Sequence, residues 1–163
     1  MIQRLLVLSV MLTTCFAWAA EKPAAAIPDF SGVWLIDPIR SHGDSIPRDT
    51  TVILIRQAGN ELTFEHYATR DIERAPRAVE VFVADGRSKK RYSTRTQVAH
   101  ARAKFDKGAL VIDTTTTLDL YGAQSFSDRE RWTLSPDGKT LTEKVSDGSV
   151  IVFHKEAAPP IQQ

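Results

Sequence analysis

Short segments of alternating apolar and polar residues, interrupted at regular intervals by glycine, proline and aspartate, constrain this chain more than any other feature. The clearest example is residues 125–134, which alternate and then meet Ser135-Pro136-Asp137-Gly138, a sequence typical of a type I turn with a following bulge. Beyond residue 19, no segment has a helical period sustained over roughly ten residues. The pattern therefore predicts an all-β fold.

Tight turns join nearly all of the predicted strands to their neighbours in sequence. The strands cover residues 31–36, 51–57, 61–67, 79–84, 96–105, 109–118, 125–134, 139–146 and 149–154. Asp85-Gly86 is predicted to form a two-residue hairpin turn into a basic segment. A long antiparallel meander exposes two edges unless its first strand pairs with its last. We therefore expect a single up-and-down antiparallel β-barrel of about 8–9 strands, with a two-sheet β-sandwich as the alternative.

The N-terminal residues have the composition of an export signal. Arg4 precedes an apolar run over residues 5–16, and Ala17-Trp18-Ala19 supplies small residues for cleavage. We expect a signal peptide at 1–19, a linker at 20–28, the barrel domain at 29–156 and a disordered tail at 157–163. The mature protein would then be exported, to the periplasm or beyond, without a transmembrane span. Residues 12–15 resemble a bacterial lipobox, so a lipid anchor at Cys15 is a second processing route.

Charge is balanced in total but segregated along the chain. The sequence has 21 Lys and Arg against 20 Asp and Glu, and residues 70–107 are strongly basic, most of all at residues 87–91. This segment suits a phosphate-bearing or membrane surface, and it equally suits a solvated edge protected against aggregation. Because little aromatic sequence accompanies it and exported proteins meet little nucleic acid, no nucleic-acid partner is expected. Cys15 is the only cysteine, so no disulfide is expected.

Three motifs resemble those of a known group of proteins. They are Asp29-Phe30-Ser31-Gly32-Val33-Trp34 with Asp37-Pro38, then Ala103-Lys104-Phe105-Asp106 leading to Leu110-Val111-Ile112, and finally residues 130–141, which carry the last long hairpin. Together they resemble lipocalins and the wider calycin barrels, and most closely a group of bacterial secreted, lipocalin-like proteins of unknown function. The resemblance implies that Gly32 and Trp34 close one end of the barrel. In such barrels an arginine from a late strand often lies over the tryptophan, and Arg131 is the nearest candidate in this chain.

Alternation also predicts which side chains face the barrel interior. Asp128 and Glu130 are in phase with Trp132, and the alanine face of residues 96–105 is expected inward because small side chains leave room. A buried carboxylate must be paired, hydrogen-bonded or protonated. We therefore predict a ligand-binding interior that contains Phe64, His66, Ala101, Asp128, Glu130 and Trp132. A satisfied interior pair near an open end is the alternative.

No motif for a nucleophile, a phosphate loop or a dinucleotide occurs, and none of the four histidines has metal-ligand spacing. No catalytic residue, metal or cofactor is therefore expected. Three functions remain open. The favoured one is binding of a small apolar or amphipathic ligand inside the barrel, since inward alanines and threonines would leave space. The others are a cell-envelope interaction module with a filled core and a basic surface at residues 87–95, and a barrel enzyme that uses Glu130 and His66.

Overall fold

Ten antiparallel strands form the described part of the chain, which in this computed structural model comprises residues 27–48, 50–94, 96–118 and 124–157. The strands are β1 (Gly32–Ile36), β2 (Val52–Ala58), β3 (Glu61–Tyr67), β4 (Ala78–Val83), β5 (Asp85–Ser93), β6 (Gln97–Asp106), β7 (Ala109–Leu118), β8 (Gln124–Leu134), β9 (Thr140–Val145) and β10 (Val150–Glu156). Within these ranges no helix suited to crossing a membrane is found. The predicted all-β fold is confirmed.

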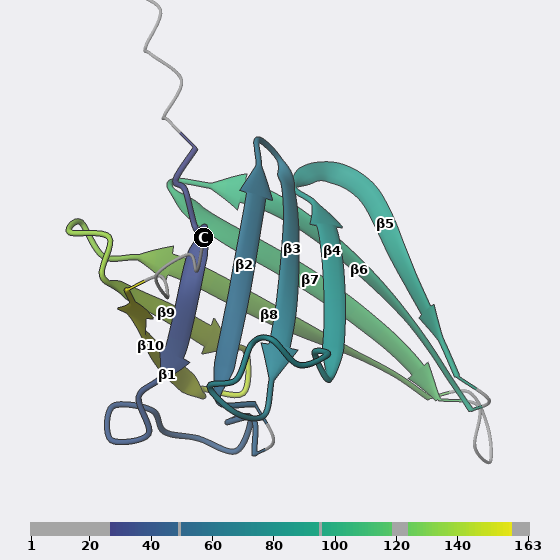
Figure 1. The fold of residues 1–163 in the computed structure, drawn as a ribbon. Coiled ribbons are helices and arrows are strands. Elements are labelled where there is room, and N and C mark those ends of the chain that lie inside the picture. The colour runs from purple at the N-terminus through teal and green to yellow at the C-terminus, as the bar shows by residue number, and fades with distance from the viewer. Residues whose placement is uncertain (1–26, 49, 95, 119–123, 158–163) are drawn as a thin grey trace, which may run out of the picture.

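The strands form one sheet in the order β4-β3-β2-β1-β10-β9-β8-β7-β6-β5. The first strand pairs with the last, so that Trp34 lies opposite Lys155 and Leu35 opposite His154. This pairing rolls the meander into a nearly closed barrel, and β2, β3 and β4 pass in front of the long strands β6, β7 and β8 (Figure 1). The predicted barrel is therefore confirmed, and the two-sheet alternative does not apply.

The barrel remains unpaired between β4 and β5, and we call this interruption the seam. The predicted hairpin at Asp85-Gly86 is wrong. The chain does turn there, because the Asp85 carboxylate accepts hydrogen bonds from the amides of Arg87 and Ser88, both at 2.7 Å, and Gly86 has a φ of 72°. However, β5 pairs with β6, and the amide after β4, that of Ala84, donates to the Asn60 carbonyl at 2.7 Å. A turn signal fixes a local bend but not the strand that the chain then meets.

The strand count is ten, slightly above the predicted 8–9. The basic segment forms a strand of its own, β5, which pairs with β6 from Lys89 to Ser93. Most of its residues are exposed, so it carries almost none of the apolar alternation from which strands are recognised.

Large apolar side chains fill one end of the interior, which we call the apolar end. Phe30 and Trp34 are fully buried there, and the Trp34 Nε1 donates to the Phe30 carbonyl at 2.8 Å. The Phe30 ring stacks on Phe105 with ring centroids 6.2 Å apart. The segment before β1 is held in place by Gln57, which bonds the Phe30 amide and the Pro28 carbonyl, both at 2.9 Å. The apolar end is thus closed by packing.

A smaller apolar cluster lies on the outer face of β1–β3. Leu35, Val52 and Tyr67 are buried there, and Ile72 from the connection between β3 and β4 packs against them. The Tyr67 hydroxyl donates to the Glu65 carboxylate at 2.6 Å. The connection thus covers apolar surface outside the barrel.

Several predictions concern residues outside the described ranges. They are the signal peptide at 1–19, the possible anchor at Cys15, most of the linker at 20–28 and all but the first residue of the tail at 157–163. They stay predictions.

Candidate functional site

Polar and ionisable side chains occupy the other end of the interior, which we call the polar end. They are His66 from β3, Glu80 from β4, Tyr92 from β5, Thr116 from β7, Glu130 from β8 and Glu143 from β9. Alternation places each of them on the inward face of its strand, in phase with buried apolar residues such as Phe64, Trp132 and Leu141. The interior thus changes from apolar to polar along the strands.

A cavity of about 270 Å³ lies at the polar end beside the seam. Its walls come from β4 to β8 and consist of Glu80, Phe82, Tyr92, Gln97, Ala99, Ala101, Ile112, Thr114, Thr116 and Glu130. Ala99 and Ala101 are buried on the β6 wall, and their small side chains leave the space open. The cavity therefore combines an apolar wall with two carboxylates and several hydroxyl groups.

Burial changes the protonation of two glutamates at the polar end. Burial, with the negative charges of Glu130 and Glu80, raises the pKa of Glu143 to about 8. Burial also raises the pKa of Glu130, although the hydrogen bond that its Oε2 accepts from Trp132 Nε1 at 3.1 Å acts in the opposite direction. At neutral pH, Glu143 therefore mostly carries a proton.

Glu80 links the polar end to both His66 and Tyr92. Its Oε2 lies 3.3 Å from His66 Nε2. The Tyr92 hydroxyl is buried beside Glu80 but forms no hydrogen bond of good geometry among the described residues. Burial, the charges of Glu80 and Glu130 and the interaction of the hydroxyl with the Glu80 side chain raise the Tyr92 pKa. A buried hydroxyl without a well-formed hydrogen bond is uncommon, and it lies in the wall of a cavity that could hold a partner from outside the chain.

Lys90 fills part of the seam. Its Nζ lies 4.6 Å from the ring centroid of Tyr92 on β5 and 5.4 Å from that of Phe82 on β4. Burial lowers the Lys90 pKa, and the charge of Glu80 opposes that shift. Because its ammonium group contacts rings from both edges of the sheet, Lys90 bridges two strands that share no ladder of hydrogen bonds.

Chemically, this arrangement can accept hydrogen bonds, neutralise a positive charge and exchange protons. The carboxyl groups of Glu80, Glu130 and Glu143 are the main acceptors, and the Glu80–His66 contact is the nearest approach to an acid–base pair. Among the residues that the structure describes, no three His, Cys, Asp or Glu side chains are grouped to hold a metal ion.

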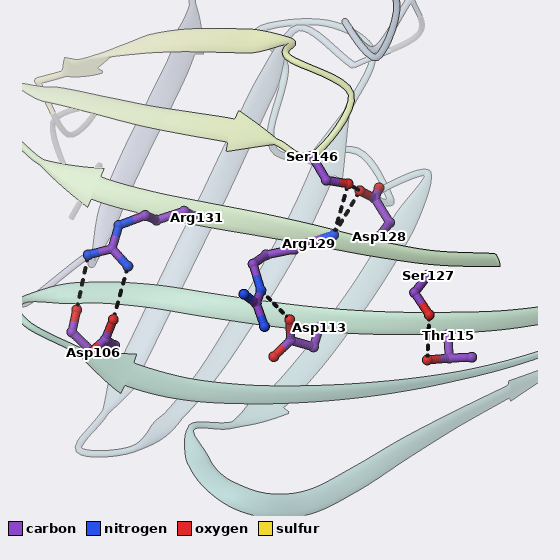
Figure 2. A network of polar contacts seen from close by, with 8 residues as sticks. All are labelled: Asp106, Asp113, Thr115, Ser127, Asp128, Arg129, Arg131 and Ser146. Carbon is purple, nitrogen blue, oxygen red and sulfur yellow. Dashed lines mark hydrogen bonds and ion pairs between the residues drawn. The ribbon is translucent and has the colours of Figure 1, made fainter.

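The six predicted ligand-binding residues lie at different depths. Ala101 and Glu130 line the cavity. Phe64 and Trp132 pack edge to face with ring centroids 5.3 Å apart, in the filled core below it. His66 contacts Glu80, and Asp128 lies at the rim, where it accepts hydrogen bonds from the Ser146 hydroxyl and the Arg129 amide (Figure 2). The residues share a face but do not all line the cavity.

The closure residues Gly32 and Trp34 lie at the apolar end, and the cation that contacts Trp34 is Lys155. Its Nζ lies 5.2 Å from the centroid of the Trp34 ring. A side chain at position 32 would require the end of the Lys155 side chain to shift, because a Cβ there would be 2.5 Å from its Cε. Arg131 instead faces outward and binds the Asp106 carboxylate and carbonyl at 3.2 and 3.3 Å (Figure 2).

Sequence reasoning missed four residues of the polar end, Glu80, Tyr92, Thr116 and Glu143, and it also missed Lys90 in the seam. Glu143 alternates with Leu141, and Glu80 alternates with Phe82, so both could have been placed inward by the pattern already used for Glu130. Lys90 and Tyr92 carry no such signal, because they alternate with basic and polar residues on an edge strand.

No protein-family model matches this chain, and no curated protein matches it. By its structure the protein is a nearly closed antiparallel β-barrel with a polar end and a small cavity.

Proposed function

We propose that this protein binds a small amphipathic molecule in the cavity at the polar end, with a positively charged head group against Glu80 and Glu130. The observation that carries the proposal is the cavity of about 270 Å³, in which both carboxylates and an apolar alanine wall are exposed to the same space. Binding sites for small molecules typically combine a mainly apolar wall with a few convergent polar groups. The resemblance to lipocalin-like proteins and the predicted export are consistent with this role.

The volume limits the size of the ligand. Ligand cavities usually measure about 300–1,000 Å³, so this one suits a molecule of few heavy atoms rather than a long lipid chain. The apolar end offers no extension, because buried side chains such as Phe64, Trp132 and Phe153 fill the interior next to the cavity. We therefore expect a short apolar body.

The polar groups favour a cation over an anion. Glu80, Glu130 and Glu143 face one another across the polar end, and their mutual repulsion contributes to the raised pKa of the two buried ones. A ligand ammonium group would relieve that repulsion, whereas a carboxylate would add to it. The Tyr92 hydroxyl offers a further donor for an acceptor atom on the ligand.

Titration with three molecules of equal length tests the proposal. Binding of n-hexylamine, n-hexanol and hexanoate at pH 7.5 would be followed by tryptophan fluorescence, since Trp132 donates to Glu130. We expect saturable binding of the amine, weaker binding of the alcohol and none of the carboxylate. Glu130→Gln should weaken amine binding about tenfold or more, because a charge-assisted hydrogen bond contributes about 1.5–3 kcal/mol.

Glu61→Gln is the matched control for this titration. It makes the same chemical change on the exposed outer face of β3, and it should leave amine binding unchanged. No saturable signal with any of the three molecules would refute binding in the cavity. Equal binding of all three, insensitive to Glu130→Gln, would refute only the preference for a cation.

A further inference from the structure

The outer face of β5 and β6 carries a group of basic side chains that the sequence alone did not bring together. It consists of Arg87, Lys89 and Arg91 on β5 and His100, Arg102 and Lys104 on β6, all exposed, and we call it the basic face. The strand register places Lys89 directly opposite Arg102 and Arg91 directly opposite His100. Two basic segments separated by a turn thus form one continuous positive surface.

No acidic side chain among the described residues forms an ion pair with the basic face. Two acids lie opposite it in the ladders: Asp85 on β5 is opposite Lys104, and Asp113 on β7 is opposite Arg102. The Asp85 carboxylate accepts hydrogen bonds from the amides of Arg87 and Ser88. Asp113 is already bound by Arg129 from β8, and Asp106 by Arg131, as Figure 2 shows. Asp113 and Asp106 therefore neutralise arginines of β8, and Asp85 is the one acid of β5, so the exposed side chains of β5 and β6 remain positive in sum.

This arrangement works against stability. Like charges directly opposite each other on neighbouring antiparallel strands destabilise the pair, and the Lys89–Arg102 pair is of that kind. Edge strands gain protection against aggregation from charge, but β6 is not an edge strand. Protection of the edge therefore accounts for the cations of β5 and not for those of β6, whereas an anionic partner would accommodate both.

Apolar surface adjoins the basic face across the seam. Val79, Val81 and Val83 on the outer face of β4 are 52%, 38% and 40% exposed. A groove of about 260 Å³ joins Val81 and Val83 to Ser88 and Lys89 of β5. Cations beside exposed aliphatic side chains are the composition of a surface that meets lipid head groups and the acyl region below them.

Two features favour a bilayer over a nucleic acid. The one aromatic residue of β5, Tyr92, points into the barrel toward Lys90 and Glu80, so the basic face offers no ring on which bases could stack. The cations lie on a sheet face rather than around a pocket, which suits lipid head groups that can rearrange laterally to meet them. We infer that the basic face is a docking surface for a bilayer rich in anionic phospholipid, independent of the ligand cavity.

Vesicle binding of the full chain tests this inference. Co-sedimentation would compare phosphatidylcholine vesicles with vesicles that contain 30% phosphatidylglycerol at low salt. We expect clear binding to the anionic vesicles only, and a fall in binding as NaCl rises from 0.05 to 0.5 M. The double variant Arg91→Ser/Arg102→Ser should bind about 30-fold more weakly, because each basic residue near an anionic surface contributes about a fivefold effect.

The control variant is Lys139→Ser/Lys144→Ser, which removes the same charge from exposed positions outside the basic face. It should bind anionic vesicles as tightly as the unmodified chain does. The apolar segment at residues 5–16 is present in the unmodified chain and in both variants, so it does not contribute to the difference in binding between them. Equal binding to neutral vesicles, or an equal loss in both variants, would overturn the inference. So would tighter binding to a single-stranded oligonucleotide than to anionic vesicles. The salt dependence of the unmodified chain remains decisive if a variant fails to fold.

Discussion

Glu143 on β9 is the residue whose environment is most at odds with its charge. It is 8% exposed and its pKa is raised to about 8, first by burial and then by neighbouring charges. The acidic groups that act on it are Glu130, Glu80, Asp128 and Asp147. Because the unfolded chain would titrate Glu143 near its ordinary value of 4.5, folding favours the protonated form.

We predict that stability falls as pH rises from about 5 to about 8. Between the unfolded and folded pKa values of Glu143 the native state binds more protons than the unfolded state, so the free energy of unfolding decreases with pH and levels off above the folded pKa. The raised pKa of Glu130 acts in the same direction. Urea denaturation at pH 5, 6.5 and 8 should show a loss of a few kcal/mol.

The variant Glu143→Gln tests how much of this pH dependence comes from Glu143. The variant should match the unmodified protein near pH 5 and be more stable by about 1–3 kcal/mol at pH 8, because the amide cannot ionise. Glu61→Gln on the outer surface should leave the pH dependence intact. An unchanged slope in Glu143→Gln would show that another group controls it.

Two tyrosines provide a second test at the residue scale. The Tyr92 hydroxyl forms no hydrogen bond of good geometry among the described residues, whereas the Tyr67 hydroxyl donates to Glu65 at 2.6 Å. Tyr92→Phe should therefore be neutral or stabilising by up to about 1 kcal/mol, and Tyr67→Phe should destabilise by about 1–2 kcal/mol. Denaturant midpoints measure both, and a larger loss in Tyr92→Phe would reveal an unrecognised partner.

Among the strands, β4 and β5 differ from the other eight because each has an unpaired edge along the seam. They are tied together mainly by Lys90, whose ammonium lies over Phe82 and Tyr92, and by the turn at Asp85. Cation–π contacts of this kind contribute about 0.5–2 kcal/mol, much less than a ladder of hydrogen bonds with packed side chains. The seam is therefore the weakest line in the sheet.

Hydrogen exchange should reveal this difference. We predict that amides of β4 and β5 exchange faster than those of β1, β7 and β10, which are paired on both sides. Lys90→Ala should increase exchange in β4 and β5 and leave β1 and β10 unchanged. Uniform protection across all ten strands would mean that the seam is closed in solution.

At the scale of the whole molecule, the pairing of β1 with β10 brings the first and last strands together. His154 lies opposite Leu35 on one side and Thr140 on the other, so β10 is an interior strand although it is last in sequence. The His154 side chain is exposed, so a substitution at this position can probe the backbone amide without disturbing the core.

We predict that His154→Pro destabilises the barrel by about 3 kcal/mol or more, because proline lacks the amide that an interior strand needs. His154→Ala, which keeps that amide, should change the free energy of unfolding by less than about 0.5 kcal/mol. Thermal and denaturant unfolding measure both. Tolerance of the proline would argue against closure through β1 and β10.

Most of the fold could be predicted because alternation is a local property. The segment from Phe126 to Leu134 alternates regardless of what it packs against, and the inward placement of Ala99, Ala101 and Ala103 followed from the same rule. The seam could not be predicted, because Asp85-Gly86 has the composition of a hairpin turn whether or not the next strand pairs with β4.

The sequence by itself determined the all-β architecture, the sequential pairing of nearly all neighbouring strands and the inward direction of Glu130 and Trp132. Only the tertiary structure decided where the sheet stays open, which cation covers Trp34, and which side chains meet around the cavity. The reason is that alternation specifies the face of a residue, whereas contacts such as Lys155 on Trp34 or Glu80 beside Tyr92 depend on register and closure. Those are set by pairings between residues far apart in the chain.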